Sequence, residues 1–165
     1  MDVFKRRSIR KYTAQEVTRE EIQELLDAAM SAPSAGNEQP WQFVVVTERR
    51  LLDLVPTVHP YADMIVAAPA AVIVCGDLNL DRFGGFWVQD CAAATENLLV
   101  HAAAMRLGAV WLGVHPLNDR VEGLRRIFSL PDHVVPLAVI PLGHPAESKT
   151  RARRYQESRV HWNGW

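Results

Sequence analysis

The sequence predicts a one-domain α/β or α+β sandwich in which four apolar strands alternate with four or five helices. Three observations support this. The 165 residues are enough for one buried core and too few for two ordinary domains. Hydrophobic residues make up 48% of the chain and charged residues 22%, a balance typical of globular proteins. Apolar runs with β-branched residues alternate with stretches of helical periodicity.

The first predicted helix covers residues 18–31. Thr18 and Glu21 have the spacing of a capping box, and the apolar residues that follow recur on one face. Pro33 ends this pattern. We therefore expect an amphipathic helix with a well-defined start, followed by a loop.

Two buried strands are expected next, at residues 41–47 and 71–76, because both runs are apolar and rich in β-branched residues. Between them Thr47 is expected to cap a short helix that runs through Val55 and is closed by Pro56. The first half of the chain thus supplies two strands and two helices.

Residues 86–107 predict the longest helix, with Gly108 marking its end. Larger apolar residues lie on one side, and alanines extend small apolar surface round both faces, which suits a helix packed on two sides. The second side could belong to another subunit, or the helix could be the central core helix of a monomer.

A third strand is expected at residues 109–114, a helix capped by Asn118 through Phe128, and a last buried strand at residues 135–143. Residues 144–154 resemble an extended connection to the terminal segment.

Cys75 and Cys91 are expected to be reduced, buried thiols. The longest apolar stretch, residues 64–75, is shorter than a membrane-spanning helix and contains Pro69. No apolar run follows the basic N-terminus, so a secretory signal is not expected. These observations predict a cytoplasmic protein without membrane contacts.

Charge is distributed unevenly along the chain. The net charge is −1, yet ten of the 18 basic residues lie within residues 1–12 and 149–161. Apolar residues accompany both runs, Ile9 and Tyr12 in the first and Trp162 and Trp165 in the second, which indicates docked segments and not frayed tails. Arginine and hydroxyl groups together suit a phosphate monoester, so a phosphorylated organic ligand is predicted.

Several other chemistries are excluded by missing motifs. The glycines form neither G-x-G-x-x-G nor a P-loop, and the six histidines lack metal-ligand spacing, so no metal site is expected. Each lone histidine is expected to be structural or exposed. The acidic middle of the chain argues against a nucleic-acid partner.

Six segments in order resemble the nitroreductase family of flavin mononucleotide (FMN) oxidoreductases, and especially its short members. They are RRSIR (residues 6–10), PSAGNEQPW (33–41), WVQDCAAATENLL (87–99), LGAVWLGV (107–114), VIPLGHPAE (139–147) and RRYQESRVHWNGW (153–165). The resemblance covers nearly the whole chain.

The resemblance implies an α+β fold, a nitroreductase-like α-β-α sandwich with a mostly antiparallel central sheet, in an intertwined homodimer. Residues 1–165 would form a single FMN-binding domain, with the C-terminal segment 149–165 docking on the partner subunit. One flavin would bind in each of two sites built from both chains.

Cofactor-binding roles carry over residue by residue. Arg6 and Ser8 would hold the flavin phosphate and ribityl chain, with Arg7 contributing chiefly through its backbone. Arg10 would face the N1 and O2 edge, where a guanidinium stabilises the negative charge of the reduced ring. The loop of the partner subunit would supply Pro33, Ser34, Ala35 and Asn37.

The ring and the phosphate would have further contacts. Trp111, Leu112 and Gly113 would lie along the ring and offer a backbone N–H to N5, and glycine permits close approach. Leu142 and Gly143 would line the same pocket through backbone groups. Arg153 or Arg154 would reach the phosphate, since RARRY matches the family motif in two registers.

The resemblance implies an enzyme that takes hydride from NADH or NADPH at flavin N5 and passes it to nitroaromatic, quinone or similar small acceptors by a ping-pong mechanism. No catalytic protein residue is required, because the cofactor carries out the chemistry. The alternative is a non-catalytic or flavin-handling protein on the same fold, and a basic-tailed module for nucleic acid or phosphoproteins is a third.

The sequence also departs from larger family members. The lid over the flavin could be formed only by residues 59–64 or 82–87, and Phe83, Phe86 and Trp87 could line a stacking pocket or belong to the core. No lysine precedes the second strand, so contacts to flavin O4 and N3 stay unassigned.

Overall fold

A five-stranded antiparallel sheet lies at the centre of the structure, a computed structural model that describes residues 3–165. Its strands have the order β1-β2-β5-β3, and β4 also pairs with β5. Their bounds are β1 Trp41–Val46, β2 Ala70–Asp77, β3 Gly108–Ala109, β4 Leu112–Gly113 and β5 Val134–Gly143. The apolar runs of β2 and β5 fit this position, because these two strands are buried on both faces.

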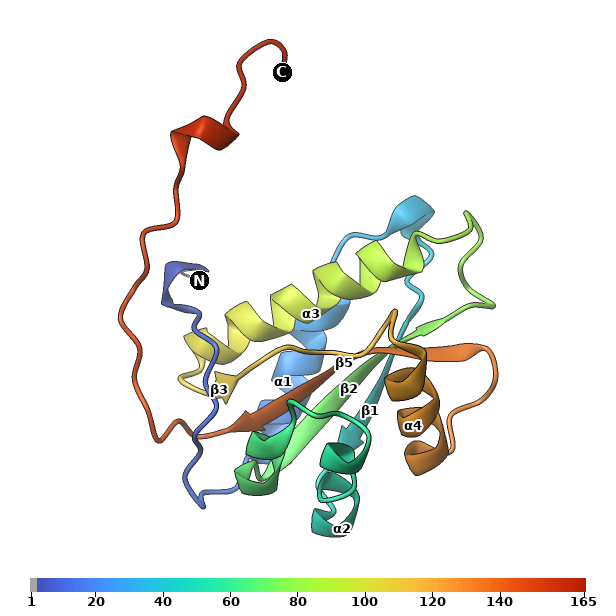
Figure 1. The fold of residues 1–165 in the computed structure, drawn as a ribbon, viewed down its shortest axis with the longest axis vertical. Coiled ribbons are helices and arrows are strands. Elements are labelled where there is room, and N and C mark those ends of the chain that lie inside the picture. The colour runs from blue at the N-terminus through green and yellow to red at the C-terminus, as the bar shows by residue number, and fades with distance from the viewer. Residues whose placement is uncertain (1–2) are drawn as a thin grey trace.

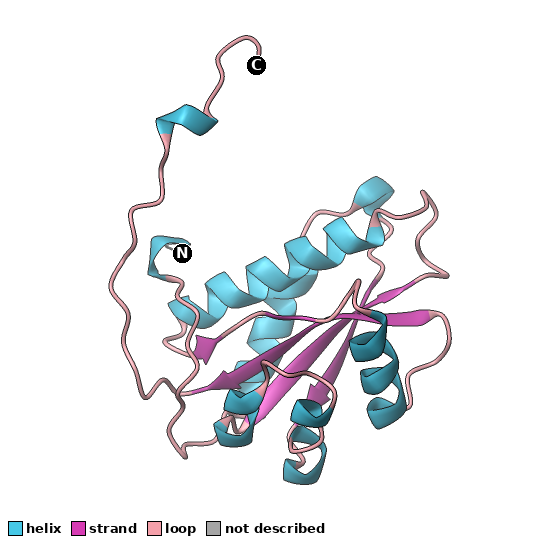
Figure 2. Ribbon diagram, in the orientation of Figure 1, coloured by secondary structure: helices cyan, strands magenta, loops and turns pink. Residues whose placement is uncertain are grey.

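Helices cover both faces of the sheet (Figure 1, Figure 2). One layer holds α1 (Arg19–Met30) and α3 (Trp87–Ala104); the other holds α2 (Arg49–Leu52), α4 (Asn118–Phe128) and the 3-10 turns Val55–Thr57 and Asp63–Ala67. Alternate residues of β2 serve the two cores, with Val72 and Val74 facing α1 and α3 and Ile73 facing the other layer. The predicted α+β sandwich is confirmed.

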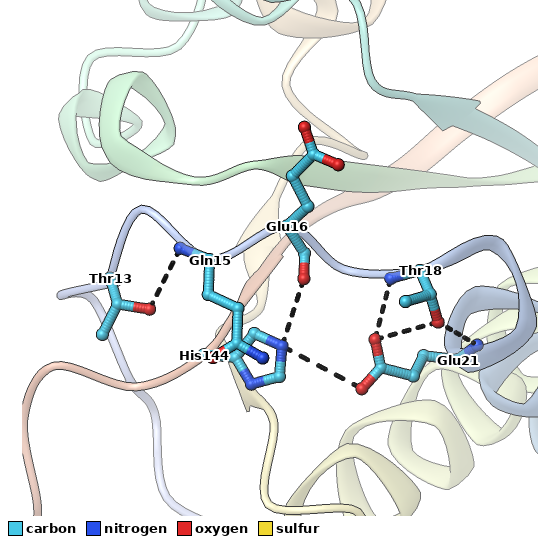
Figure 3. A network of polar contacts seen from close by, with 6 residues as sticks. All are labelled: Thr13, Gln15, Glu16, Thr18, Glu21 and His144. Atoms are coloured by element: carbon cyan, nitrogen blue, oxygen red, sulfur yellow. Dashed lines mark hydrogen bonds and ion pairs between the residues drawn. The ribbon is translucent and has the colours of Figure 1, made fainter.

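Helix α1 begins where the sequence predicts. The Thr18 N–H donates to Glu21 Oε2 at 2.8 Å, and the Glu21 N–H donates to Thr18 Oγ1 at 3.1 Å, which completes the capping box (Figure 3). His144, just after β5, lies near the same cap, with its Nε2 3.2 Å from the Glu16 carbonyl oxygen and 4.0 Å from Glu21 Oε1. The helix start is thereby tied to the end of the central strand.

Helix α3 is shorter than predicted, and Gly108 does not end it. The helix stops at Ala104, and Arg106 takes a left-handed conformation with φ 63°. Gly108 instead begins β3, where a Cβ would lie 2.7 Å from Ile9 Cγ2. Close approach of the N-terminal segment therefore requires this glycine. The predicted packing on two sides is confirmed within one chain, since α3 contacts both α1 and the sheet.

Strand β1 and helix α2 also differ from the prediction. β1 is an edge strand with exposed Gln42 and Val45, so the expectation of a buried strand was wrong. Thr47 does not cap α2, because Glu48 occupies the N-cap and makes no side-chain cap bond. Pro56 lies inside the following 3-10 turn instead of closing the helix.

The run predicted as one strand at residues 109–114 is divided. β3 and β4 each contribute two residues, and both pair with β5, while Val110 and Trp111 between them belong to neither. Asn118 is the first residue of α4 and not its cap, which is Leu117. The predicted last strand is confirmed and extends one residue further, to Val134.

Cys75 and Cys91 are free and buried, as predicted, and burial raises the pKa of each thiol to about 12. Within residues 3–165 no helix has the length and apolarity needed to cross a bilayer. The same part of the chain contains no cluster of three His, Cys, Asp or Glu residues that could hold a metal ion.

The C-terminal segment leaves the body of the molecule (Figure 1). Residues 148–165 are exposed throughout, and their one regular element is the 3-10 turn Glu157–Arg159. Trp162 is 85% exposed and Trp165 fully exposed. Two tryptophans in water are unfavourable, so this segment lacks the apolar cover that its sequence requires.

Candidate functional site

The basic N-terminal motif is held along the edge of the sheet by its two apolar residues. Ile9 and Tyr12 are each 8% exposed, and the Tyr12 hydroxyl donates to the Ile9 carbonyl oxygen at 2.8 Å. The Ile9 N–H donates to the Ala109 carbonyl at 3.0 Å. These anchors leave Arg6, Ser8 and the other polar residues of the motif at the surface.

The residues after β5 run beside this motif and are hydrogen-bonded to it. Lys149 Nζ donates to the Ser8 carbonyl at 2.6 Å, and the Arg10 N–H donates to Glu147 Oε1 at 2.6 Å. That bond lowers the pKa of Glu147 and keeps its carboxylate charged. The segments of residues 6–10 and 147–154, which are distant in sequence, therefore form one surface.

A basic hollow of about 270 Å³ lies between the two segments. Its lining consists of five cationic side chains and one serine: Arg6, Arg7, Ser8, Arg10, Lys149 and Arg154. A carboxylate partly offsets this charge from outside, since Arg6 Nε lies 3.2 Å from Glu96 Oε1. Arg7 Nε is buried and has no hydrogen-bond partner among the described residues. Such a set of donors fits an anion with several acceptor oxygens.

A wider hollow of about 940 Å³ continues along the tail. It is lined by Val3, Phe4, Arg6, Arg7 and residues 151–155. The Arg151 guanidinium lies 3.9 Å from the centre of the Phe4 ring. Arg154 lines both hollows, whereas Arg153 lines only the wider one. The geometry therefore favours Arg154 of the two arginines that the sequence left open.

Apart from the basic hollow and its wider continuation, there is a separate hollow of about 490 Å³, which we call the second hollow. It adjoins the basic hollow, because Arg10 lines both. Trp111, Leu112 and Gly113 form part of its wall, and residues 59–61, 63 and 64 form much of the rest. Within this wall Gly113 is exposed, and a Cβ built on it would meet nothing within 4 Å. The space beside its backbone is open to a flat group.

Two polar side chains approach the carbonyl oxygen of Gly113. His59 Nε2 lies 2.9 Å from the Gly113 carbonyl oxygen, and Arg120 Nη1 donates to the same oxygen at 2.8 Å. Arg120 also lies over the Tyr61 ring, 5.4 Å from its centre. His59, Tyr61, Asp63 and Arg120 line this second hollow, and sequence reasoning named none of these side chains as binding residues.

These residues carry little signal in the sequence. His59 is a lone histidine, which we expected to be structural or exposed, and Arg120 stands in the first turn of an amphipathic helix, where charged residues are common. Only the tertiary fold brings them to Gly113.

The predicted binding loop lies elsewhere in the chain. Pro33, Ser34, Ala35 and Asn37 precede or form the 3-10 turn Ala35–Asn37 near the start of α3, where the Ala35 N–H donates to Asp90 Oδ1 at 3.1 Å. The N-terminal motif lies near the opposite end of α3 (Figure 1). One chain therefore does not bring this loop to the basic hollow.

The other predicted residues are divided between site and core. Leu142 is fully buried among core residues, and a Cβ on Gly143 would lie 2.8 Å from both Tyr12 Cδ1 and Pro69 Cδ. Neither lines the three hollows described above. Of the two lid candidates, residues 59–64 line the second hollow except for the fully buried Ala62. In the other candidate, Phe83 at 57% and Phe86 at 44% are exposed, and Trp87 is core.

The chain matches one protein-family model and resembles proteins of other organisms along its whole length. The family model described as "Nitroreductase family" matches residues 3–72 and 61–144. A protein of Methanothermobacter thermautotrophicus named "Putative NADH dehydrogenase/NAD(P)H nitroreductase" is 52% identical over 169 residues, which cover 100% of this chain and 88% of the relative.

Two solved structures have the same fold. A "Putative NADH Oxidase" from Clostridium acetobutylicum is 40% identical, with a TM-score of 0.96 over 99% of this chain and 100% of its own. A protein from Desulfovibrio desulfuricans, whose structure is described as that of a "putative nitroreductase in complex with fmn", is 29% identical, with a TM-score of 0.84 over 98% of this chain and 94% of its own.

Proposed function

The chain belongs to the nitroreductase family and is an FMN-dependent NAD(P)H oxidoreductase, and we propose that it reduces nitroaromatic, quinone or similar small acceptors by a ping-pong mechanism. The observation that carries the proposal is the pairing of two hollows through Arg10. The basic hollow suits a phosphate. The second hollow is lined by Gly113, beside whose backbone the space is open. Bound FMN would supply the hydride chemistry, receiving hydride from NAD(P)H at N5 and giving it to the acceptor.

The residues present fit this cofactor. A phosphate monoester carries nearly two negative charges, which the cationic lining of the basic hollow would neutralise. The buried Arg7 Nε has a hydrogen to donate and no partner among the described residues, so an acceptor oxygen would satisfy it. Arg6, Ser8 and Arg154 would bind the phosphate and its chain, with Arg7 adding a donor.

Arg10 has a distinct role because it lines both hollows. A guanidinium there would stabilise negative charge at the N1 and O2 edge of the ring, as the family resemblance implies. The backbone of Trp111, Leu112 and Gly113 would orient the ring. None of these groups needs to transfer a proton for hydride to move.

A second copy of the chain would complete each site. The loop that contains Pro33, Ser34, Ala35 and Asn37 lies away from the basic hollow of its own chain, and the tail exposes two tryptophans. We propose a homodimer in which residues 149–165 dock on the partner and each partner's loop reaches the other's hollow. Leu142 and Gly143 would support this pocket from behind, through β5.

Residues 1–165 would act as one FMN-binding domain. The two free thiols suit a reducing compartment, which supports a cytoplasmic location.

Anaerobic titration of the purified protein tests the function. We expect yellow protein that releases FMN on denaturation, bleaches with NADH or NADPH and recovers its colour with a nitroaromatic or quinone. Arg10→Ala should bind FMN and be reduced more slowly, by roughly one to two orders of magnitude. Protein that holds FMN but is never bleached would instead be a non-catalytic flavin carrier.

A further inference from the structure

Two side chains from different elements converge on one backbone oxygen of the second hollow. The Gly113 carbonyl oxygen lies 2.9 Å from His59 Nε2 and 2.8 Å from Arg120 Nη1. His59 precedes the 3-10 turn Asp63–Ala67, and Arg120 lies in the first turn of α4. This carbonyl thus links the layer that contains α2 and α4 to strand β4, which lines the second hollow.

The hydrogen-bond pattern assigns the histidine tautomer. The Tyr61 N–H donates to His59 Nδ1 at 3.3 Å, which favours a lone pair on Nδ1 and a hydrogen on Nε2 that goes to Gly113. Arg120 Nη1 lies 3.4 Å from the same Nε2, and both nitrogens point their hydrogens at the Gly113 oxygen in this tautomer. His59 is 1% exposed, and its burial, together with the Arg120 charge, lowers the pKa of the imidazole. His59 is therefore a neutral donor held in one orientation.

The sheet alone holds this segment weakly. β4 pairs with β5 through only Leu112 and Gly113, and the preceding Val110 and Trp111 lie outside both short strands. Beyond β4, the Val114 N–H and the His115 N–H share one acceptor, the Leu137 carbonyl. The two side-chain donors therefore supply restraint that a longer ladder would otherwise give.

We propose that His59 and Arg120 are positioning residues that fix the Gly113 peptide and, through it, the backbone of residues 111–113 against the bound flavin. The inference rests on the proposed function, which places this backbone along the ring. Neither side chain has to touch the cofactor for this role, since both act through the Gly113 carbonyl. A displaced backbone would lose its alignment with the reacting edge of the ring.

The first test uses the protein without cofactor. In His59→Phe and Arg120→Met, hydrogen exchange of peptides that cover residues 111–115 should be roughly tenfold faster than in the parent protein, while exchange in α1 stays unchanged. Arg126→Met is the matched control, because Arg126 is an exposed arginine of the same helix. Unchanged exchange at 111–115 in both variants would overturn the proposal.

The second test uses FMN-loaded protein and measures the reduction potential of the bound flavin. We expect the ratio of the affinities for reduced and oxidised FMN to fall roughly fivefold in both variants, because the aligned backbone favours the reduced ring. His59→Gln and Arg120→Lys keep a donor and should restore most of the parent potential. A potential that stays at the parent value in His59→Phe and Arg120→Met would also overturn the proposal.

The two proposals fail in different ways. If the parent protein neither retains FMN nor is bleached by NAD(P)H, the proposed function fails, and the exchange experiment still reports whether His59 and Arg120 hold Gly113. If the parent is reduced normally and both variants match it in exchange and potential, only the positioning role fails. Since His59 is buried, Arg120→Met keeps the test decisive should His59→Phe fail to fold.

Discussion

At the scale of single residues, Gly113 offers a direct test of where the cofactor ring binds. A methyl group at this position would point into open space, and the backbone there has no positive φ. Gly113→Ala should therefore leave the stability of the cofactor-free protein nearly unchanged and weaken FMN binding by roughly tenfold or more, because the methyl group would occupy the ring's place. Fluorescence titration with FMN measures the loss.

A second glycine provides the control for this substitution. In Gly123→Ala the new Cβ would lie 2.6 Å from Val58 Cβ, inside the packed layer of α4. This variant should lose stability in a urea titration and keep its FMN affinity where it remains folded. If Gly113→Ala binds FMN as tightly as the parent, the ring does not lie against this backbone.

His59 predicts how stability depends on pH. Its pKa is lowered in the folded protein by burial and by the nearby charge of Arg120, so between the folded value and the unfolded value of about 6.5 the unfolded chain binds more protons. The stabilisation from a neutral His59 is complete above pH 6.5. It is lost as the pH falls from 6.5 toward the folded pKa.

His59→Gln isolates this contribution, since glutamine can donate to Gly113 and does not titrate. The difference in the free energy of unfolding between parent and variant should be constant above about pH 7 and shift against the parent below about 6.5, by at most about 1.4 kcal/mol per pH unit. Urea titrations at several pH values measure it. Parallel curves throughout would mean that His59 titrates normally.

At the scale of elements, the start of α1 depends on a local device. Thr18→Ala removes one half of the capping box and should lower the free energy of unfolding by about 1 kcal/mol. Thr47→Ala is the matched control and should have no effect, because Thr47 is exposed and does not cap α2. If the two variants unfold at the same urea concentration, the cap does not contribute to stability.

The contrast between local signals and contacts made by distant parts of the chain explains which elements could be predicted from the sequence. The capping box and the apolar runs of β2 and β5 are local signals, and these elements begin and end close to the expected positions. The exposure of β1 depends on its place at the sheet edge, which its own residues do not encode. Gly108 suggested a helix end, but the glycine is required because Ile9 packs on it from a distant part of the chain.

The candidate site likewise contains residues that belong to sequence motifs and residues that do not. The arginines of residues 6–10 and the backbone of residues 111–113 belong to contiguous motifs, and the structure places them in adjoining hollows. His59 and Arg120 have no motif, because their role follows from the contact of two turns with β4. Their shared acceptor is visible only in three dimensions.

At the scale of the whole molecule, the separation of the loop and the basic hollow predicts complementation between subunits. Arg10→Glu damages the hollow and Pro33→Glu damages the loop, and both residues are exposed, so folding should survive. Each variant alone should bind FMN poorly. Refolded as a mixture, they should regain about one quarter of the parent sites, because each mixed dimer has one site without either substitution.

The control mixes each variant with itself by the same procedure and should recover nothing. FMN retained after gel filtration gives the number of intact sites. Absence of recovery in the mixture, with dimers present, would place the loop and the hollow of a site in the same subunit.

The exposed tail has a consequence for the life of the protein in a cell. Residues 148–156 form an exposed stretch without helix or strand, and this stretch carries four of the five basic residues of the tail. Proteases bind their substrates as extended chain, and exposed segments of this kind are preferred cleavage sites. In the proposed homodimer the partner would cover this stretch, so a free subunit would be cut faster than an assembled one. Survival of the folded chain would then depend on its concentration, because dilute subunits assemble less.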